Sequence, residues 1–179
     1  MTELTILKFI NILKKENIDR KVLSSLVVEK CIDKKFILST VESCTGGLIS
    51  KKITDINGSS AMFECGVCTY ANRIKEKLVN VKHATLDKLG AVSEETAIEM
   101  ANGIKILSGS DISVSTTGIA GPSGGSVEKP VGLVYLAVCS NAGCKSYKLS
   151  PDENQNLSRE EIRDFTSDLA LYLVLKNID

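Results

Sequence analysis

The sequence predicts an α/β fold, a three-layer α/β/α sandwich whose central sheet is mixed and mostly parallel. Two observations lead to this prediction. Segments with apolar residues at helical spacing alternate with short apolar runs rich in β-branched residues, and turns of glycine, serine and threonine separate them. Helices that alternate with strands are typical of a sheet covered on both faces. With 179 residues, 43% of them hydrophobic, the chain is expected to form one domain with a complete core.

We divide this single domain, 1–179, into N-terminal helices (1–35), a core that carries the motifs (36–163) and a C-terminal helix (157–178). The first two helices are expected at 4–15 and 22–33, because apolar residues recur there every three or four positions. Neither helix contains residues that suggest chemistry.

The next elements form a strand, a turn and a helix. The apolar run 36–38 predicts a buried strand at 36–41, and a helix is expected to follow it at 45–54. A second strand is expected at 62–70 and a helix at 73–80, capped by Asn72. A longer helix begins after Ser93 as N-cap and ends at 108–109.

The last third begins with a strand at 112–117 and a loop rich in glycine and proline at 118–132. An apolar strand at 133–138 and a hairpin turn at 141–143 lead into a strand at 145–149. The final helix, 157–176, is expected to start at Ser158, since glutamates occupy its first turn.

The charge balance excludes two classes of partner. Basic and acidic residues number 22 each, so no excess charge favours a nucleic acid or an anionic membrane, although a local basic pocket remains open. No apolar stretch approaches the roughly 20 residues needed to span a bilayer, and the first residues lack the order of a signal peptide. We therefore expect a cytoplasmic protein.

Six cysteines raise the question of disulfides or a metal. Disulfides are not expected in the reducing cytoplasm. Cys65 and Cys68 form a C-x-x-C pair on an expected strand, where residues three apart face opposite sides, and the lone His83 is poorly placed as a further ligand. We expect no metal site and mostly small core cysteines; redox sensing by Cys65 and Cys68 is a minor alternative.

The turn 42–47 is the first candidate for chemistry. It offers a nucleophilic serine, a thiol and backbone N–H groups at a helix N-terminus, which suit a phosphate or an oxyanion. Simple N-capping explains the same residues equally well. The spacing of a P-loop is missing. The loop 117–125 is a stronger indication, because so many glycines cost backbone entropy unless a ligand approaches closely.

These turns, with a third at 58–60, are expected to converge beyond the carboxyl ends of the strands. Because His83 is the single histidine and lies in a charged stretch, a serine here would need Tyr70 or Lys75 as its base. By itself, Lys75 would more often be a solvated helix lysine. Glu128 and Lys129 can pair with each other, and the arginines at 159 and 163 can pair with acids or clamp a phosphate.

Five strings resemble the CinA C-terminal domain family: TVESCTGG at 40–47, GSSA at 58–61, TYANRIK at 69–75, GAVSEET at 90–96 and TGIAGPSGGSVEKPVG at 117–132. The resemblance covers roughly 36–163. Members of this family are nicotinamide-nucleotide amidohydrolases, also called NMN deamidases or PncC. The resemblance implies hydrolysis of nicotinamide mononucleotide (NMN) to nicotinic acid mononucleotide and ammonia, a step of pyridine-nucleotide salvage.

The same resemblance assigns residues. The catalytic candidates are Ser43, Ser60, Tyr70, Lys75 and Thr117. The substrate-binding candidates are Thr45, Gly46, Gly47, Gly118, Ala120, Gly121, Gly124, Gly125, Arg159 and Arg163. Either serine could attack the amide carbon, with Lys75 or Tyr70 as base and glycine-loop N–H groups holding the oxyanion. No cofactor and no metal are expected, the partner is NMN, and a homo-oligomer is the default for such an enzyme.

Three departures from the family pattern bear on activity. Ala71 replaces a serine, Ser123 replaces an aspartate of the glycine loop, and 156–159 replace a G-D-R string before the last helix. The alternative function is therefore a non-catalytic CinA-like module that binds a nucleotide or a protein.

Overall fold

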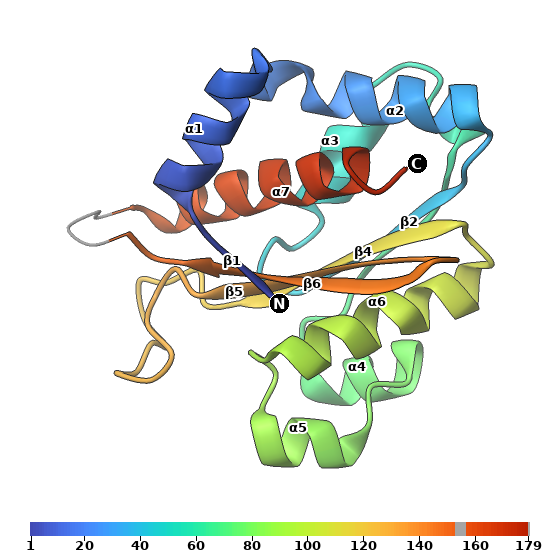
Figure 1. The fold of residues 1–179 in the computed structure, drawn as a ribbon. Helices are drawn as coiled ribbons and strands as arrows, with labels where there is room; N and C mark the ends of the chain where they lie inside the picture. Colours follow the sequence, from blue (N-terminus) through green and yellow to red (C-terminus); the bar gives the residue numbers. More distant parts are fainter. Residues whose placement is uncertain (153–156, 179) are drawn as a thin grey trace.

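The computed structural model describes residues 1–152 and 157–178, which form a six-stranded sheet between two layers of helices (Figure 1). The strands lie in the order β1-β6-β5-β4-β2-β3. They are β1 (Thr2–Thr5), β2 (Leu38–Glu42), β3 (Phe63–Cys68), β4 (Ile112–Gly118), β5 (Val134–Ser140) and β6 (Gly143–Ser150). Among these strands only β5 runs antiparallel to its neighbours, so the predicted mixed, mostly parallel sheet is confirmed.

The helices cover both faces of the sheet. They are α1 (Ile6–Glu16), α2 (Leu23–Lys34), α3 (Leu48–Thr54), α4 (Asn72–Val79), α5 (His83–Leu89), α6 (Glu94–Ser108) and α7 (Arg159–Leu175), with short 3₁₀ turns at Arg20–Val22 and Ser59–Ala61. Helices α1, α2, α3 and α7 lie on one face, and α4, α5 and α6 lie on the other (Figure 1). The predicted three-layer architecture is therefore confirmed.

Each helical layer buries its own apolar cluster against the sheet. The larger cluster lies under α1, α2 and α7 and includes Phe9, Leu23 and Leu136, all fully buried. A smaller cluster joins α4 and α6 to Val41 of β2 through Val79 and Met100. These two cores hold the sheet rigidly, and loops at its edges can therefore be placed accurately.

The direction of the strands decides where functional residues meet. Because β2, β3, β4 and β6 are mutually parallel, their carboxyl ends share one edge of the sheet. The segments that follow them contain Ser43, Tyr70, the glycine loop and the start of α7. Ligands of α/β sheets bind at such an edge.

Four local predictions need correction. The expected helix 4–15 begins only at Ile6, because Thr2–Thr5 form strand β1, which pairs in parallel with β6. This pairing joins opposite ends of the chain and leaves no local pattern. Helix α5 was not predicted, and α3 begins at Leu48 rather than at Thr45. Asn72 is the first residue of α4 and not its cap, since Ala71 precedes the helix without a capping side chain. The predicted start of the last helix is confirmed: Ser158 and Glu161 form a capping box.

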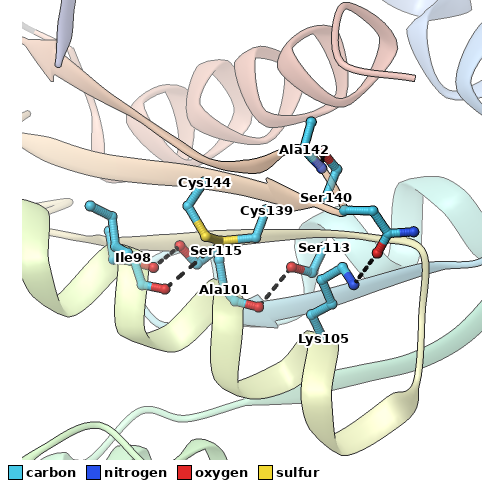
Figure 2. The surroundings of a disulfide bond; sticks show 11 residues. Ile98, Ala101, Lys105, Ser113, Ser115, Cys139, Ser140, Ala142 and Cys144 are labelled. Atoms are coloured by element: carbon cyan, nitrogen blue, oxygen red, sulfur yellow. Dashed lines mark hydrogen bonds between the residues drawn. A yellow bond between two sulfur atoms is a disulfide. The ribbon is translucent and has the colours of Figure 1, made fainter. Parts of the chain in front are cut away.

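The expectation that the chain forms no disulfide is wrong. A two-residue turn between β5 and β6 places Cys139 directly opposite Cys144, and their sulfur atoms are bonded. Figure 2 shows the bond facing α6, beside the bonds that Ser113 and Ser115 of β4 donate to α6 carbonyl groups. Register between two strands, which composition does not reveal, brings the two thiols together.

The other cysteines fit the sequence analysis. Cys31 and Cys44 are buried core residues, and Cys65 and Cys68 face opposite sides of β3, one half-buried and one exposed. Within residues 1–152 and 157–178, no cluster of three metal-ligating side chains occurs. In the same residues, no helix combines the length and apolar character needed to cross a bilayer.

Candidate active site

A cavity opens at the edge of the sheet where β2, β3 and β4 end. Four of the five predicted catalytic residues line it: Ser43, Tyr70, Lys75 and Thr117. Three of the predicted substrate-binding residues line it as well: Gly118, Ala120 and Arg159. These residues come from four separate segments, so the cavity exists only in the folded chain.

Ser43 and Lys75 form the centre of this cavity. Lys75 Nζ lies 3.0 Å from Ser43 Oγ and 2.6 Å from the carbonyl oxygen of Thr69. The Lys75 side chain is only 1% exposed, because it points from the first turn of α4 back under the end of β3. This burial lowers the pKa of Lys75 from 10.5 to about 8. The lysine is therefore a base that neutral or mildly alkaline solution can deprotonate.

Main-chain hydrogen bonds fix the two segments that carry this pair. Just beyond β2, the N–H of Ser43 donates to the carbonyl oxygen of Thr116 at 2.9 Å. Just beyond β3, the N–H of Thr69 donates to the carbonyl oxygen of Glu42 at 2.8 Å. Both bonds continue the ladders of the sheet by one residue. The serine and the lysine are thus held by the sheet rather than by flexible loops.

Thr117 contributes an acceptor to the cavity. Its hydroxyl donates to the carbonyl oxygen of Ala91 at 2.7 Å, and the side chain is nearly fully buried. Since the single hydroxyl hydrogen is used in this bond, only the oxygen lone pairs remain for a ligand. The bond also fixes the connection between α5 and α6, where Ala91 and Val92 line the cavity.

Arg159 closes one side of the cavity. From the first residue of α7, its guanidinium donates to the carbonyl oxygen of Gly121 at 2.8 Å and to the hydroxyl oxygen of Tyr70 at 3.2 Å. Tyr70 is 66% exposed and forms the rim. The arginine therefore bridges the glycine loop and the β3–α4 junction, and further N–H groups of its guanidinium remain for an anion.

Glycine is required at Gly118, at the end of β4. A Cβ atom at this position would lie 2.6 Å from the carbonyl oxygen of Leu133, which belongs to the chain entering β5. The glycine loop is thereby able to turn back over the cavity.

Ser60 is not brought to the cavity within one chain. It lies in the exposed turn that precedes β3, beside the amino ends of the strands. Strand β2 has five residues and spans about 16 Å at about 3.3 Å per residue, so Ser60 lies at the opposite edge of the sheet.

Other predicted binding residues also lie outside the cavity. Arg163 donates to the carbonyl oxygen of Thr45 at 2.8 Å and borders a separate hollow beside α3. The Thr45 hydroxyl bonds to Thr116, and the Gly47 N–H donates to the carboxylate of Glu42. Like Arg163, Thr45 and Gly47, the glycines Gly46, Gly121, Gly124 and Gly125 do not line the cavity.

The structure also shows the surroundings of two other residues named in the sequence analysis, Cys44 and Lys129. Burial raises the pKa of the Cys44 thiol to about 12, so this cysteine stays protonated and is a poor nucleophile although it lines the cavity. Lys129 donates to the carbonyl oxygen of Leu89 at 2.7 Å, at the end of α5. The pair with Glu128 that the sequence left open does not occur among the described residues.

Sequence reasoning missed the wall formed by Ala91 and Val92 and the role of the Glu42 side chain. Ala91 and Val92 both lie in the string GAVSEET at 90–96, but Ala91 acts through its carbonyl group, which every residue type has, so its residue type gave no sign of this role. The sequence did contain one indication of the role of Glu42. An acidic residue at the end of a buried strand requires hydrogen-bond donors around its carboxylate.

Comparison with known proteins supports the family suggested by the motifs. Residues 20–178 match the model of the CinA C-terminal domain. The chain belongs to the CinA C-terminal domain family. A "CinA-like protein" of Geotalea uraniireducens is 47% identical over 162 residues, which cover 89% of this chain and 37% of that protein. A "CinA-like protein" of Geobacter sulfurreducens is 50% identical over 141 residues, which cover 78% and 33%.

Members of the CinA family with solved structures share the fold. The competence/damage inducible protein CihA from Agrobacterium tumefaciens superposes with a TM-score of 0.83 at 39% identity, covering 88% of this chain and 94% of that one. A CinA superfamily protein from Klebsiella pneumoniae gives a TM-score of 0.82 at 27% identity, covering 89% and 98%. The chain spans well under half the length of the two CinA-like relatives above.

Proposed function

We propose that this CinA domain is an amidohydrolase that converts NMN to nicotinic acid mononucleotide and ammonia. The observation that carries the proposal is the buried pair of Ser43 and Lys75, whose reactive atoms lie 3.0 Å apart in a cavity. A serine beside a lysine of lowered pKa is a known arrangement for nucleophilic attack on an amide without histidine. NMN is proposed as the substrate because the motifs resemble those of NMN deamidases.

The proposed reaction has two stages. Neutral Lys75 takes the proton of Ser43 as Oγ attacks the carboxamide carbon, and a tetrahedral intermediate forms. The C–N bond then breaks, ammonia leaves with the proton from Lys75, and the acyl group remains as an ester on Ser43. In the second stage Lys75 takes a proton from the water that attacks the ester carbon. The bond between that carbon and Ser43 Oγ then breaks, Lys75 returns the proton to Oγ, and the acid is released. The Thr69 carbonyl accepts one N–H of Lys75 and leaves the lone pair to face Ser43.

Three groups around this pair suit the rest of the substrate. The lone pairs of Thr117 can accept from the carboxamide NH₂, which the acid product lacks. The N–H of Ala120 has no acceptor in the described part of the chain, and we propose it as a donor to the oxyanion. Arg159 is proposed to bind the phosphate, because it is the cation at the mouth of the cavity.

The decisive experiment measures ammonia release from NMN. The unsubstituted protein should release it, and Ser43→Ala should reduce kcat at least about 10³-fold, because the nucleophile is lost. Cys44→Ser is the matched control in the same turn and should retain most activity. A shift of Tm by NMN without any ammonia would identify the non-catalytic binding module instead.

Ser60→Ala separates two arrangements of the enzyme. If the site lies within one chain, this variant keeps its activity, since Ser60 is at the far edge of the sheet. A loss of activity would show that a second copy of the chain brings Ser60 to the cavity, as a homo-oligomer could. Full activity in both Ser43→Ala and Ser60→Ala would contradict the covalent serine mechanism.

A further inference from the structure

The side chain of Glu42 is completely buried beside the candidate nucleophile. One carboxylate oxygen accepts from the N–H groups of Gly47 and Ile49, at 2.9 and 3.1 Å. The other accepts from the N–H and the hydroxyl of Ser50, at 2.9 and 2.8 Å. The carboxylate therefore satisfies three N–H groups at the start of α3, those of Gly47, Ile49 and Ser50, and the substrate cannot use these groups.

A further hydrogen bond, between Ser50 and Thr40, extends this arrangement into the sheet. The Ser50 hydroxyl gives its hydrogen to Glu42, so the Thr40 hydroxyl must donate to Ser50 across their 2.8 Å contact. In residues 1–152 and 157–178, no lysine or arginine pairs with Glu42. A buried carboxylate held only by N–H and O–H groups is costly to desolvate, so each of its hydrogen bonds matters.

Ordinary capping does not explain this geometry. The N-cap residue of α3 is Gly47, which has no side chain, and a serine or aspartate there would cap the helix locally. The acid instead reaches from the last position of β2 and closes a loop that contains Ser43. The turn that presents the nucleophile is thus tied to its own strand at both ends.

Glu42 also connects to the proposed base. Its carbonyl oxygen accepts from the N–H of Thr69, and the carbonyl oxygen of Thr69 accepts from Lys75 Nζ. One residue therefore fixes the serine through its side chain and the lysine through its main chain. The separation of the two reactive atoms depends on both connections.

We propose that Glu42 is a positioning residue, which holds Ser43 at the distance and angle that Lys75 needs. The proposal rests on the proposed amidohydrolase function and adds to it a residue that does not line the cavity and acts through the turn. In this arrangement the N-terminus of α3 binds the carboxylate of Glu42 and not the substrate. The substrate phosphate is then bound on the side of the cavity formed by Arg159.

Glu42→Gln tests this proposal. The glutamine has the same size, but in either orientation its NH₂ group faces at least one main-chain N–H donor, so at least one of the four hydrogen bonds is lost. We expect kcat for NMN to fall about 100-fold, because small displacements of a nucleophile have effects of this order. KM should stay within about twofold, since no contact with substrate is removed.

Asp168→Asn is the matched control. Asp168 is also buried, 4% exposed, and pairs with Lys52 at the other end of α3, away from the cavity. Both variants should lower Tm, but only Glu42→Gln should lower kcat at temperatures where both are folded. An equal loss of kcat in the two variants, or unchanged kcat in Glu42→Gln, would overturn the proposal.

Two further measurements test the proposal if Glu42→Gln does not fold or if NMN is not the substrate. Ser50→Ala removes one of the four donors and keeps the acid, and we expect a smaller fall in kcat of about 5-fold. Covalent labelling of Ser43 by a fluorophosphonate needs no substrate, and the rate should fall in parallel in Glu42→Gln and Ser50→Ala. If the unsubstituted protein releases no ammonia, the proposed function fails, and the labelling rates still decide the role of Glu42.

Discussion

Lys75 shows how one residue acquires reactivity from its surroundings. Lysine is rarely buried, yet here the ammonium is nearly inaccessible and donates to Ser43 and to a main-chain carbonyl group. No acidic partner neutralises it among the described residues, so burial disfavours its charged form and lowers its pKa to about 8. In the sequence, Lys75 was a candidate for two reasons only: the single histidine was unsuitable as the base, and Lys75 lies in a family motif. The burial of Lys75 depends on the fold.

The pKa of Lys75 predicts the pH dependence of the proposed reaction. The lysine acts as a base only when neutral, so kcat/KM for NMN should rise about tenfold per pH unit below pH 8 and level off above it. Lys75→Arg should be inactive throughout, because a guanidinium stays protonated. A profile that is flat between about pH 6.5 and 9.5, or a midpoint near the ordinary value of 10.5, would contradict this assignment.

Folding stability should change in the same range for the same reason. The folded pKa of Lys75 lies below its unfolded value, so between about pH 8 and 10.5 the unfolded chain binds more protons. The contribution of Lys75 to stability is therefore unfavourable below pH 8 and improves as the pH rises. The site retains a destabilising lysine, which is common where a buried group performs chemistry.

At the scale of elements, α4 and α6 must pack closely for Lys75 to reach Ser43. Gly103 of α6 lies against the last turn of α4, and a Cβ atom at this position would be 1.8 Å from the carbonyl oxygen of Val79. A glycine inside a helical pattern can indicate such an approach, but the sequence does not show which helix approaches. In the same way, the sequence indicated that Ser158 caps α7. In the structure this cap places Arg159, the first residue of the helix, at the cavity.

Gly103→Ala should therefore impair both stability and catalysis. The added methyl group must displace α4, with an expected loss of about 1–3 kcal/mol in the free energy of unfolding. Because α4 carries Lys75, kcat should fall as well. Asn102→Ala, an exposed change on the same helix, should leave both nearly unchanged. Denaturant unfolding and ammonia release measure the two effects, and equal stability of the two variants would contradict the packing argument.

At the scale of the whole molecule, the two edges of the sheet have different roles. The carboxyl ends of β2, β3 and β4 surround the cavity, and the opposite edge holds the β5–β6 turn with the disulfide (Figures 1 and 2). Since the sheet separates them, changes at the disulfide should affect stability without reaching the reactive groups.

Thiol titration and reduction test this separation. In denaturant, four thiols should react before reduction and six after it. Reduction should lower the free energy of unfolding by about 2 kcal/mol, the value expected for a short closed loop, and leave kcat unchanged. Cys68→Ser removes an exposed free thiol and should have neither effect. Six reactive thiols in the untreated protein would contradict the assignment of the bond.

The sequence alone determined the fold class, most of the helices and strands, and the motifs that carry Ser43, Tyr70, Lys75 and Thr117. These depend on hydrophobic periodicity, capping and turn chemistry, which act between residues close in the chain. Only the tertiary structure decided that Ser60 and Arg163 lie outside the cavity, that Glu42 occupies the N-terminus of α3, that Thr2–Thr5 form a strand and that Cys139 meets Cys144. Each of these depends on strand direction, register or side-chain burial. The packing of the whole sheet sets these properties, even where the partners are only five to eight residues apart, as for Glu42 and Cys139, so the residue pattern along the chain does not fix them.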